Sequence, residues 1–399
     1  MPPLRTPLRT FLATATPASV LLRQVLLFSA LDVVFLGFAM AYAFKHWGLP
    51  GALLYLCAQY ITSAVGFVGT FIAMQSPDRT PAKLLRRGLG GMLLGMLLMG
   101  AYSPSWWGLL CLTLAGAGRG MAWAARQWLE MHHTKGEVRE RFLALLQTGA
   151  TLFKLGGPLV AAALMYATSE NFGLLFGSVG ALGFLTLWAT RAQVGLETPP
   201  PGPARPLQTL RDTDYWKTAP FYILGGAGSS LRQALFVSGT MTVVGSVSGY
   251  GVIDALSSLA AAGFLAWMAR RPKAGPSLPR LQFSLAFVGV SWLLLLGALK
   301  WPWLLAGFVA FYSFGNPLLI SVKTSLVLKG LTSATSAPHD NAMAREMLLV
   351  VSRMVALGIA AVLAQANPHI GLLLVVGLVL LLLPFEYLFA RELSQRPNV

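Results

Sequence analysis

Long apolar stretches, separated by short polar segments, run through the chain from about residue 20 to residue 390. A helix needs roughly 20 predominantly apolar residues to cross the hydrocarbon core of a bilayer, and it satisfies its backbone hydrogen bonds without water. The pattern therefore predicts an all-α membrane protein with twelve transmembrane helices. The predicted spans are residues 20–44, 51–75, 84–102, 105–129, 141–166, 172–190, 219–244, 249–269, 281–299, 303–328, 345–366 and 370–390.

Composition supports a polytopic membrane protein. Of the 399 residues, 55% are hydrophobic and 11% are charged, whereas about 25% of the residues of a soluble domain are charged. The net charge of +16 would indicate a nucleic-acid partner for a soluble protein. In a membrane protein, Lys and Arg retained in cytoplasmic loops explain the same excess. We therefore expect a lipid bilayer as partner and no nucleic acid.

The loop charges predict the orientation. If the N-terminus is cytoplasmic, the outer loops carry only Lys45 and Lys300, and the other basic loop residues are cytoplasmic. Such one-sidedness predicts a bacterial-type inner-membrane protein with both termini in the cytoplasm. The basic residues assigned to cytoplasmic loops and the C-terminal tail are Arg79, Lys83, Arg86, Arg87, Lys135, Arg139, Arg141, Arg191, Arg205, Arg211, Lys217, Arg270, Arg271, Lys273, Arg280, Lys329, Arg345, Arg391 and Arg396.

The longest predicted loop divides the chain into two halves of six spans. It contains Pro199-Pro200-Pro201-Gly202-Pro203, which cannot form a helix and indicates a linker. Two such halves are typical of a repeat fold with its substrate site between them, near the bilayer midplane. The predicted parts are an N-terminal tail (1–19), a six-helix bundle (20–190), the linker (191–218), a second six-helix bundle (219–390) and a C-terminal tail (391–399).

The polar loop between the second and third spans carries a motif. Together with the twelve-span layout, its Asp78, Arg79 and Lys83 make the chain resemble the major facilitator superfamily of secondary transporters, in which this loop reads Gly-x-x-x-Asp-Arg-x-Gly-Arg-Lys. Three other positions depart from that pattern and hold Met74, Pro81 and Ala82.

The fifth predicted span adds to the resemblance. Gly157-Pro158, followed by two alanines, is similar to the Gly-Pro-x-x-Gly-Gly signature of antiporters in that family, although Phe153 replaces an expected glycine. The resemblance implies alternating access by a monomer, with a slight preference for export. It also implies gating roles for Asp78, Arg79, Lys83, Gly157 and Pro158.

Charged residues inside spans are costly, so they pair, face a cavity or contact a substrate. At 1.5 Å per residue, Asp32, Lys154 and Arg232 come near mid-membrane, while Arg119 lies past the middle and Arg353 in the cytoplasmic half. An internal ion pair, for example of Asp32 with Lys154 or Arg119, is one explanation. A single deep acid cannot neutralise all four cations, however, so the excess indicates an anionic substrate.

The leading hypothesis is therefore proton-coupled transport of a small organic anion that bears a carboxylate or phosphate, because Arg binds such groups in bidentate fashion. Asp32 is the predicted proton-coupling residue. Three further charges, Arg126, Lys323 and Glu386, lie close enough to the cytoplasmic interface to act as anchors, and Asp254 lies near the outer end of its span. The predicted substrate-binding residues are Arg119, Lys154, Arg232, Arg353, Asn316 and Tyr312.

Other signals favour packing. Met92, Met96 and Met99 share one helical face and indicate packing or lipid contact, and His339 is expected in a loop, so we predict no metal site. No nucleophile elbow, nucleotide-binding loop or His-Glu-x-x-His occurs, so we expect no enzyme and no cofactor. The alternatives are a transporter of lipids, amphiphiles or metal chelates, or a non-transporting receptor or assembly factor that acts through loops such as 331–341.

Overall fold

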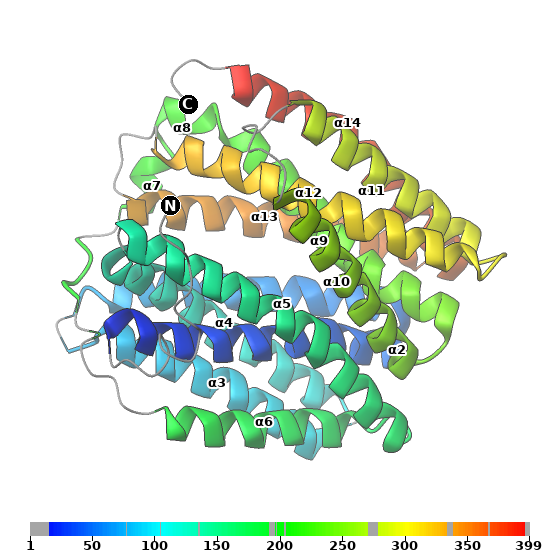
Figure 1. The fold of residues 1–399 in the computed structure, drawn as a ribbon, viewed down its shortest axis with the longest axis horizontal. Helices are drawn as coiled ribbons and strands as arrows, with labels where there is room; N and C mark the ends of the chain where they lie inside the picture. Colours follow the sequence, from blue (N-terminus) through cyan, green and yellow to red (C-terminus); the bar gives the residue numbers. More distant parts are fainter. Residues whose placement is uncertain are drawn as a thin grey trace. The chain divides into compact units, whose positions relative to one another are not determined.

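The computed structural model is all-helical over the part of the chain that it describes (Figure 1). That part comprises residues 16–76, 78–103, 105–134, 136–190, 196, 198–202, 205–269, 278–332, 338–365 and 368–395. The helices are α2 (Pro17–Ala73), α3 (Pro81–Tyr102), α4 (Trp106–His133), α5 (Gly136–Ala167), α6 (Phe172–Ala189), α7 (Pro206–Thr209), α8 (Thr213–Trp216), α9 (Ala219–Val244), α10 (Val247–Ala269), α11 (Leu278–Ala298), α12 (Leu304–Thr332), α13 (Pro338–Ala364) and α14 (Pro368–Gln395).

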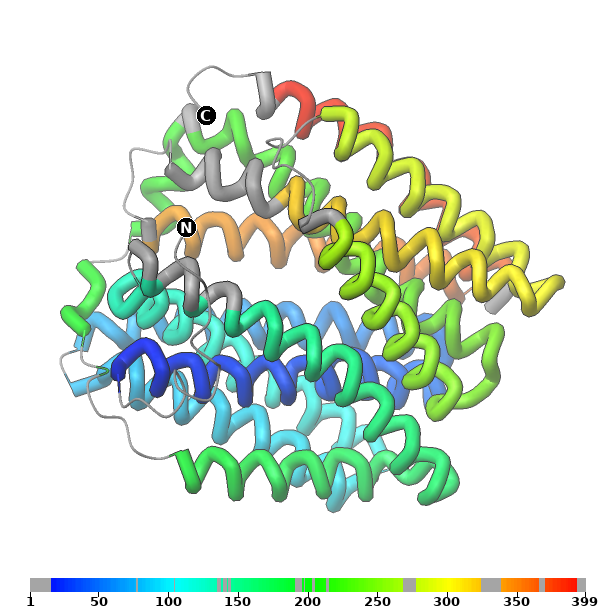
Figure 2. The backbone as a smooth tube through the Cα atoms, viewed as in Figure 1, coloured from blue at the N-terminus to red at the C-terminus, as the bar shows by residue number. Residues whose placement is uncertain are grey.

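Helix α2 contains the first two predicted spans. Its 57 residues are interrupted only at Gly48, whose φ of 65° and ψ of −165° are not helical. Glycine tolerates this positive φ because it has no Cβ, and Pro50 restarts the helix without needing a hydrogen-bonded N–H. Figure 2 shows the two limbs of α2 in blue on either side of this kink, and they run in opposite directions.

Nine helices within the described ranges are long and apolar enough to cross a membrane. Helices α4 and α9 are not among them, although they have 28 and 26 residues. Both contain Gly-rich runs and arginines, namely Arg119, Arg126 and Arg232. The two helices that fall short in hydropathy are therefore helices that carry deep charges.

Helices α5 and α13 begin well before their predicted starts. Helix α5 begins at Gly136 instead of 141, and α13 begins at Pro338 instead of 345. The loop expected at 331–341 is consequently wrong in part, because His339 and Asp340 lie in the first turn of α13 and are buried. Pro is well tolerated in a first turn, where its missing N–H has no intrahelical partner to lose.

The central linker is held at two points. Trp128 of α4 donates from Nε1 to the carbonyl of Pro199 (3.1 Å), and the backbone N–H of Arg205 donates to Asp340 Oδ1 (2.6 Å). Two short helices, α7 and α8, follow. Several residues used in the sequence analysis lie outside the described residues: Arg191 and Pro203 of the predicted linker, the basic residues within 270–273, and Arg396.

The chain forms two compact units. Unit 1 comprises residues 1–36, 62–157 and 171–204, and unit 2 comprises residues 37–61, 158–170 and 205–399. Two segments of the first half of the sequence, 37–61 and 158–170, thus belong to the same unit as the second half. The predicted division into bundles 20–190 and 219–390 stays a prediction.

Within unit 1, α3 packs against α4 and α6. The α3–α4 contact is close because glycines face backbone: a Cβ on Gly118 would lie 2.6 Å from both Gly88 O and Met92 N. Met92, Met96 and Met99 are fully buried there. Of the two interpretations of this methionine face, packing is confirmed and lipid contact is wrong.

Within unit 2, α9 packs against α13 and α14, α11 against α12 and α14, and α10 against α12. An aromatic cluster fills the centre. Tyr312 stacks on Phe236 with ring centroids 4.9 Å apart, and Trp292 lies 5.4 Å from Tyr312 and 5.5 Å from Phe308. Phe236 follows Arg232 by one turn of α9, so this cluster adjoins the charges described below.

Candidate functional site

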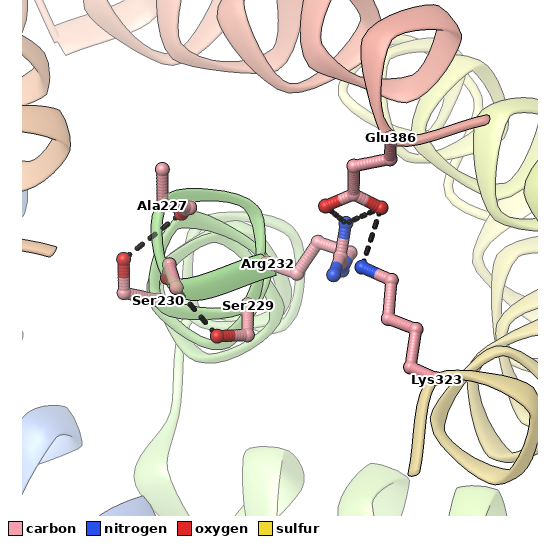
Figure 3. Close-up of polar contacts among 7 residues, drawn as sticks. Ala227, Ser229, Ser230, Arg232, Lys323 and Glu386 are labelled. Carbon is pink, nitrogen blue, oxygen red and sulfur yellow. Dashed lines mark hydrogen bonds and ion pairs between the residues drawn. The ribbon is translucent and has the colours of Figure 1, made fainter. Parts of the chain in front are cut away.

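The first half of α9 is shaped by its glycines. A Cβ on Gly226 would lie 2.4 Å from Ser352 Oγ of α13, and a Cβ on Gly228 would lie 2.1 Å from Glu386 Oε1 of α14. The missing side chain at Gly228 is therefore what lets a carboxylate reach the backbone of α9. Ser229 and Ser230 donate to the carbonyls of Gly226 and Ala227 (3.0 and 2.9 Å), so their hydroxyls are used within the helix (Figure 3).

One turn further along α9, Arg232 meets Glu386 and Lys323 (Figure 3). Arg232 Nη1 lies 3.1 and 3.3 Å from the two oxygens of Glu386, and Lys323 Nζ lies 2.6 Å from Oε2. The side chains of Arg232, Glu386 and Lys323 are 5%, 1% and 14% exposed. These residues of α9, α14 and α12 form what we call the charge triad. The interpretation of Lys323 and Glu386 as interfacial anchors is wrong, because both are ion-paired and Glu386 is fully buried.

The charge triad is not electrically balanced. Two cations share one carboxylate, so the group carries a net charge of +1 when all three are ionised. Removing charge from water costs several kcal/mol per ion even after relaxation, and a buried pair recovers this only with good geometry. One cation would be enough to pair with Glu386 if the role of the pair were purely structural. The second cation leaves the charge triad with one positive charge more than Glu386 neutralises.

Helix α12 places two other predicted residues next to the charge triad. Tyr312, Asn316 and Lys323 are separated by four and seven residues, a spacing that puts them on one helical face. The Tyr312 hydroxyl lies within electrostatic range of Arg232. The predicted residues Arg232, Tyr312 and Asn316 therefore belong to one region of unit 2, and Asn316 is half-buried there.

Arg353 of α13 lies in the same unit and has its own partners. Its guanidinium contacts Glu346 Oε1 (3.3 Å) and covers the ring of Tyr60, 4.4 Å from the centroid. The Tyr60 hydroxyl donates to Gln233 Oε1 (2.8 Å), and Gln233 follows Arg232 in α9. Arg353 is thus tied to α9 through Tyr60.

Unit 1 contains a second deep ion pair. Arg119 Nε lies 2.5 Å from Asp32 Oδ1 and Arg119 Nη2 lies 3.4 Å from Oδ2, with side chains 18% and 20% exposed. The glycines on each side of Arg119 explain its position. A Cβ on Gly120 would lie 1.8 Å from the carbonyl oxygen of Ser63, so α4 packs on the second limb of α2 while Arg119 reaches Asp32 on the first limb. Of the pairings considered for Asp32, the structure forms the one with Arg119.

Arg126 lies two turns after Arg119. It pairs with Glu130 (2.7 Å), and its guanidinium lies 5.2 Å from the Trp123 ring and 5.9 Å from the Phe28 ring. Because its side chain is only 14% exposed, the interpretation of Arg126 as an interfacial anchor in solvent is wrong. Aromatic faces and a carboxylate hold it within unit 1.

Lys154 is the exception among the deep cations. Contacts of Gly149 with Leu26 and of Gly157 with Val33 place it beside the middle of the first limb of α2. Its side chain is exposed and forms no ion pair with any residue that the structure describes. The argument that one acid must neutralise four cations is therefore corrected: Glu346 and Glu386 supply partners, and the excess is one charge in the charge triad and one at Lys154.

Comparison with known proteins decides the family. The model of the Major Facilitator Superfamily matches residues 24–337. The chain belongs to the major facilitator superfamily. No curated protein sequence matches it. The fold class and the resemblance inferred from the sequence are confirmed, and the protein is a multi-pass, MFS-type secondary transporter, not an enzyme.

Solved transporters share the fold. A POT family transporter in complex with 5-aminolevulinic acid is similar with a TM-score of 0.71 at 12% identity over 95% of this chain and 96% of that one. The peptide transporter POT in complex with sulfate has a TM-score of 0.69 at 15% identity over 95% of both chains. The human organic anion transporter MFSD10 (TETRAN) has a TM-score of 0.62 at 15% identity over 94% of this chain and 98% of that one.

The gating residues implied by the superfamily motif lie at the start of α3 and within α5. Asp78, Arg79 and Lys83 are exposed, and Thr80 caps α3 between them. Pro158 is buried, and its carbonyl would lie 2.9 Å from a Cβ on Gly251 of α10. The boundary between the two units falls between Gly157 and Pro158.

Sequence reasoning missed a cluster around Glu170, in the loop after α5. Its carboxylate accepts from Lys45 Nζ and from the backbone N–H of Val247 (2.6 Å each), and more weakly from Ser248 N–H (3.4 Å). Burial raises the pKa of Glu170, but these hydrogen bonds outweigh it and hold the pKa below its ordinary value. Glu170 thus ties α2 to the positive N-terminal end of α10. The available signal was that Glu170 and Lys45, which have opposite charges, both lie in predicted outer loops.

No group of three His, Cys, Asp or Glu side chains suited to a metal ion occurs among the described residues. Cys57 and Cys111 are both half-buried free thiols.

Proposed function

We propose that this transporter moves a small organic anion, bearing a carboxylate or phosphate, by alternating access. The observation that carries the proposal is the charge triad, in which Arg232 and Lys323 share the single carboxylate of Glu386. A guanidinium binds a carboxylate or phosphate through two parallel hydrogen bonds, and an ammonium adds a point charge. Among the similar solved transporters, one is in complex with 5-aminolevulinic acid, one is in complex with sulfate and one is an organic anion transporter, which supports this substrate class.

The proposed substrate contacts extend beyond the charge triad. Tyr312 and Asn316 would hydrogen-bond the substrate from the same face of α12, and the exposed Lys154 would attract it electrostatically. We keep Arg119 and Arg353 as proposed contacts that must first leave their carboxylate partners.

Asp32 is the proposed proton-coupling residue. Its carboxylate pairs with Arg119, so a substrate that competes for Arg119 would break this ion pair, and that step would couple substrate binding to Asp32. Export by antiport across an inner membrane, with both termini cytoplasmic and the monomer as the working unit, completes the proposal. The proposal also assigns the gating of alternating access to Asp78, Arg79, Lys83, Gly157 and Pro158.

Comparative mass spectrometry of cells and growth medium tests the substrate class. Cells that lack the protein receive the wild type, Lys323→Gln or the control Arg87→Gln, which removes an exposed cation from α3. We expect wild type and Arg87→Gln to shift one acidic metabolite between cells and medium. Cells with Lys323→Gln should show the same distribution of this metabolite as cells that lack the protein. A shift confined to neutral metabolites or lipids would refute the anion hypothesis.

Transport of that metabolite in proteoliposomes tests the coupling residue. We expect Asp32→Asn to abolish transport driven by a pH gradient while exchange of labelled for unlabelled substrate continues. Gradient-driven transport that persists in Asp32→Asn would remove Asp32 from this role.

A further inference from the structure

We infer that Glu386 determines how many negative charges the transported anion carries. With Glu386 ionised, one further negative charge neutralises the charge triad, so the site favours a monoanion over a dianion of the same shape. The inference rests on the proposed function, because it assumes that Arg232 and Lys323 bind the anion. It makes Glu386 a specificity-determining residue that need not contact the substrate.

The three charges of the charge triad act on one another. Within the described residues, the charged groups that act on Lys323 are Glu386 and Arg232, and those that act on Glu386 are Arg232 and Lys323. The hydroxyls of Ser229 and Ser230 return to carbonyls of α9. The net charge of the charge triad is therefore the sum over these three side chains, while Asp254 acts on the neighbouring Tyr312.

The geometry leaves donors for one more anionic group. Arg232 uses Nη1 for Glu386, and Lys323 uses one of its three N–H groups. Guanidinium carries five N–H donors, so both cations keep donors that Glu386 does not occupy. A further anionic group would therefore find free donors on both cations while the carboxylate keeps its own.

Glu386 is also held too firmly to leave easily. It is 1% exposed, and both of its oxygens are within 3.3 Å of a cation. The carboxylate lies in the space that Gly228 leaves open on α9. A dianion would thus bring the site to a net charge of −1 in a poorly hydrated place, which is as unfavourable as the initial excess of +1.

Calorimetric binding of succinate and monomethyl succinate to the purified transporter measures this preference. At about pH 7.5 the carboxylates are ionised, so the two probes differ by one charge and have nearly the same shape. We expect wild type to bind monomethyl succinate at least tenfold more tightly than succinate. We expect Glu386→Gln, whose charge triad carries +2, to bind succinate at least tenfold more tightly than monomethyl succinate.

Three further variants separate charge from disruption. Glu392→Gln removes the same charge from an exposed position on α14 and should keep the wild-type ratio. Lys323→Gln brings the charge triad to zero and should bind both probes at least tenfold more weakly. The double variant Glu386→Gln/Lys323→Gln returns the net charge to +1 and should regain the monoanion preference, so the comparison holds even if Glu386→Gln alone does not fold.

The outcomes distinguish the two proposals. If wild type binds anions but the ratio is unchanged in Glu386→Gln, or if the double variant does not regain the monoanion preference, charge selection is wrong and the anion transporter stands. If wild type binds neither probe, nor sulfate, the proposed function is wrong and the inference falls with it.

Discussion

Replacing Gly228 by alanine tests the glycine that admits Glu386 to α9. The new Cβ would lie 2.1 Å from Glu386 Oε1 and 2.9 Å from Arg232 Nη1. Real Cβ atoms essentially never approach below 3.0 Å, so the carboxylate must move by about 0.9 Å. That shift stretches its contacts of 3.1 Å with Arg232 and 2.6 Å with Lys323.

The magnitude follows from two opposing effects. Exchanging glycine for alanine inside a helix stabilises it by about 0.5–1 kcal/mol, and overpacking a buried site costs about 1–3 kcal/mol. Gly225→Ala is the matched control, because its Cβ would meet nothing within 4 Å among the described residues of the same helix. The stabilisation of the helix by alanine is the same in both variants. We therefore expect Gly228→Ala to be less stable than Gly225→Ala by about 1–3 kcal/mol.

The assay is unfolding in mixed detergent micelles by increasing SDS, followed by tryptophan fluorescence. A double-mutant cycle with Glu386→Ala identifies the cause, because the shortened side chain removes the clash. We expect a coupling free energy of about 0.5–3 kcal/mol between the two changes. Equal stability of Gly228→Ala and Gly225→Ala, or purely additive effects in the cycle, would refute the proposed crowding.

Two further predictions concern the other contacts. Because the pKa of Glu170 is lowered, its bond to Lys45 contributes stability above the ordinary glutamate pKa of 4.5, and the contribution is lost as pH falls through the folded-state value. The stability difference between wild type and Glu170→Gln should therefore be largest near neutral pH and vanish in acid; a pH-independent difference would contradict this. In unit 1, Gly120→Ala should destabilise by about 1–3 kcal/mol relative to Gly90→Ala, since the first Cβ meets backbone of Ser63 at 1.8 Å and the second meets nothing. Thermal unfolding in detergent compares the two, and equal midpoints would be the contrary result.

The sequence determined those features that depend on each helix separately. An apolar stretch of sufficient length must form a helix in a bilayer, because no other local structure satisfies its backbone. The helices, the kinked pair in α2 and the family motif at Asp78 and Arg79 were therefore accessible from the residues alone. The depths of Asp32 and Arg232 were accessible too, since depth follows from residue count and helical rise.

The tertiary structure alone decided which charges meet. Arg232 and Glu386 are 154 positions apart, and their contact depends on the rotation and approach of α9 and α14, which Gly228 permits. Counting residues placed Glu386 near an interface, but burial depends on the helices that cover a position and not on its distance from the helix end. Ion pairing depends on which helices are neighbours. The sequence therefore specifies where each charge lies along its helix, and packing specifies which opposite charge it meets.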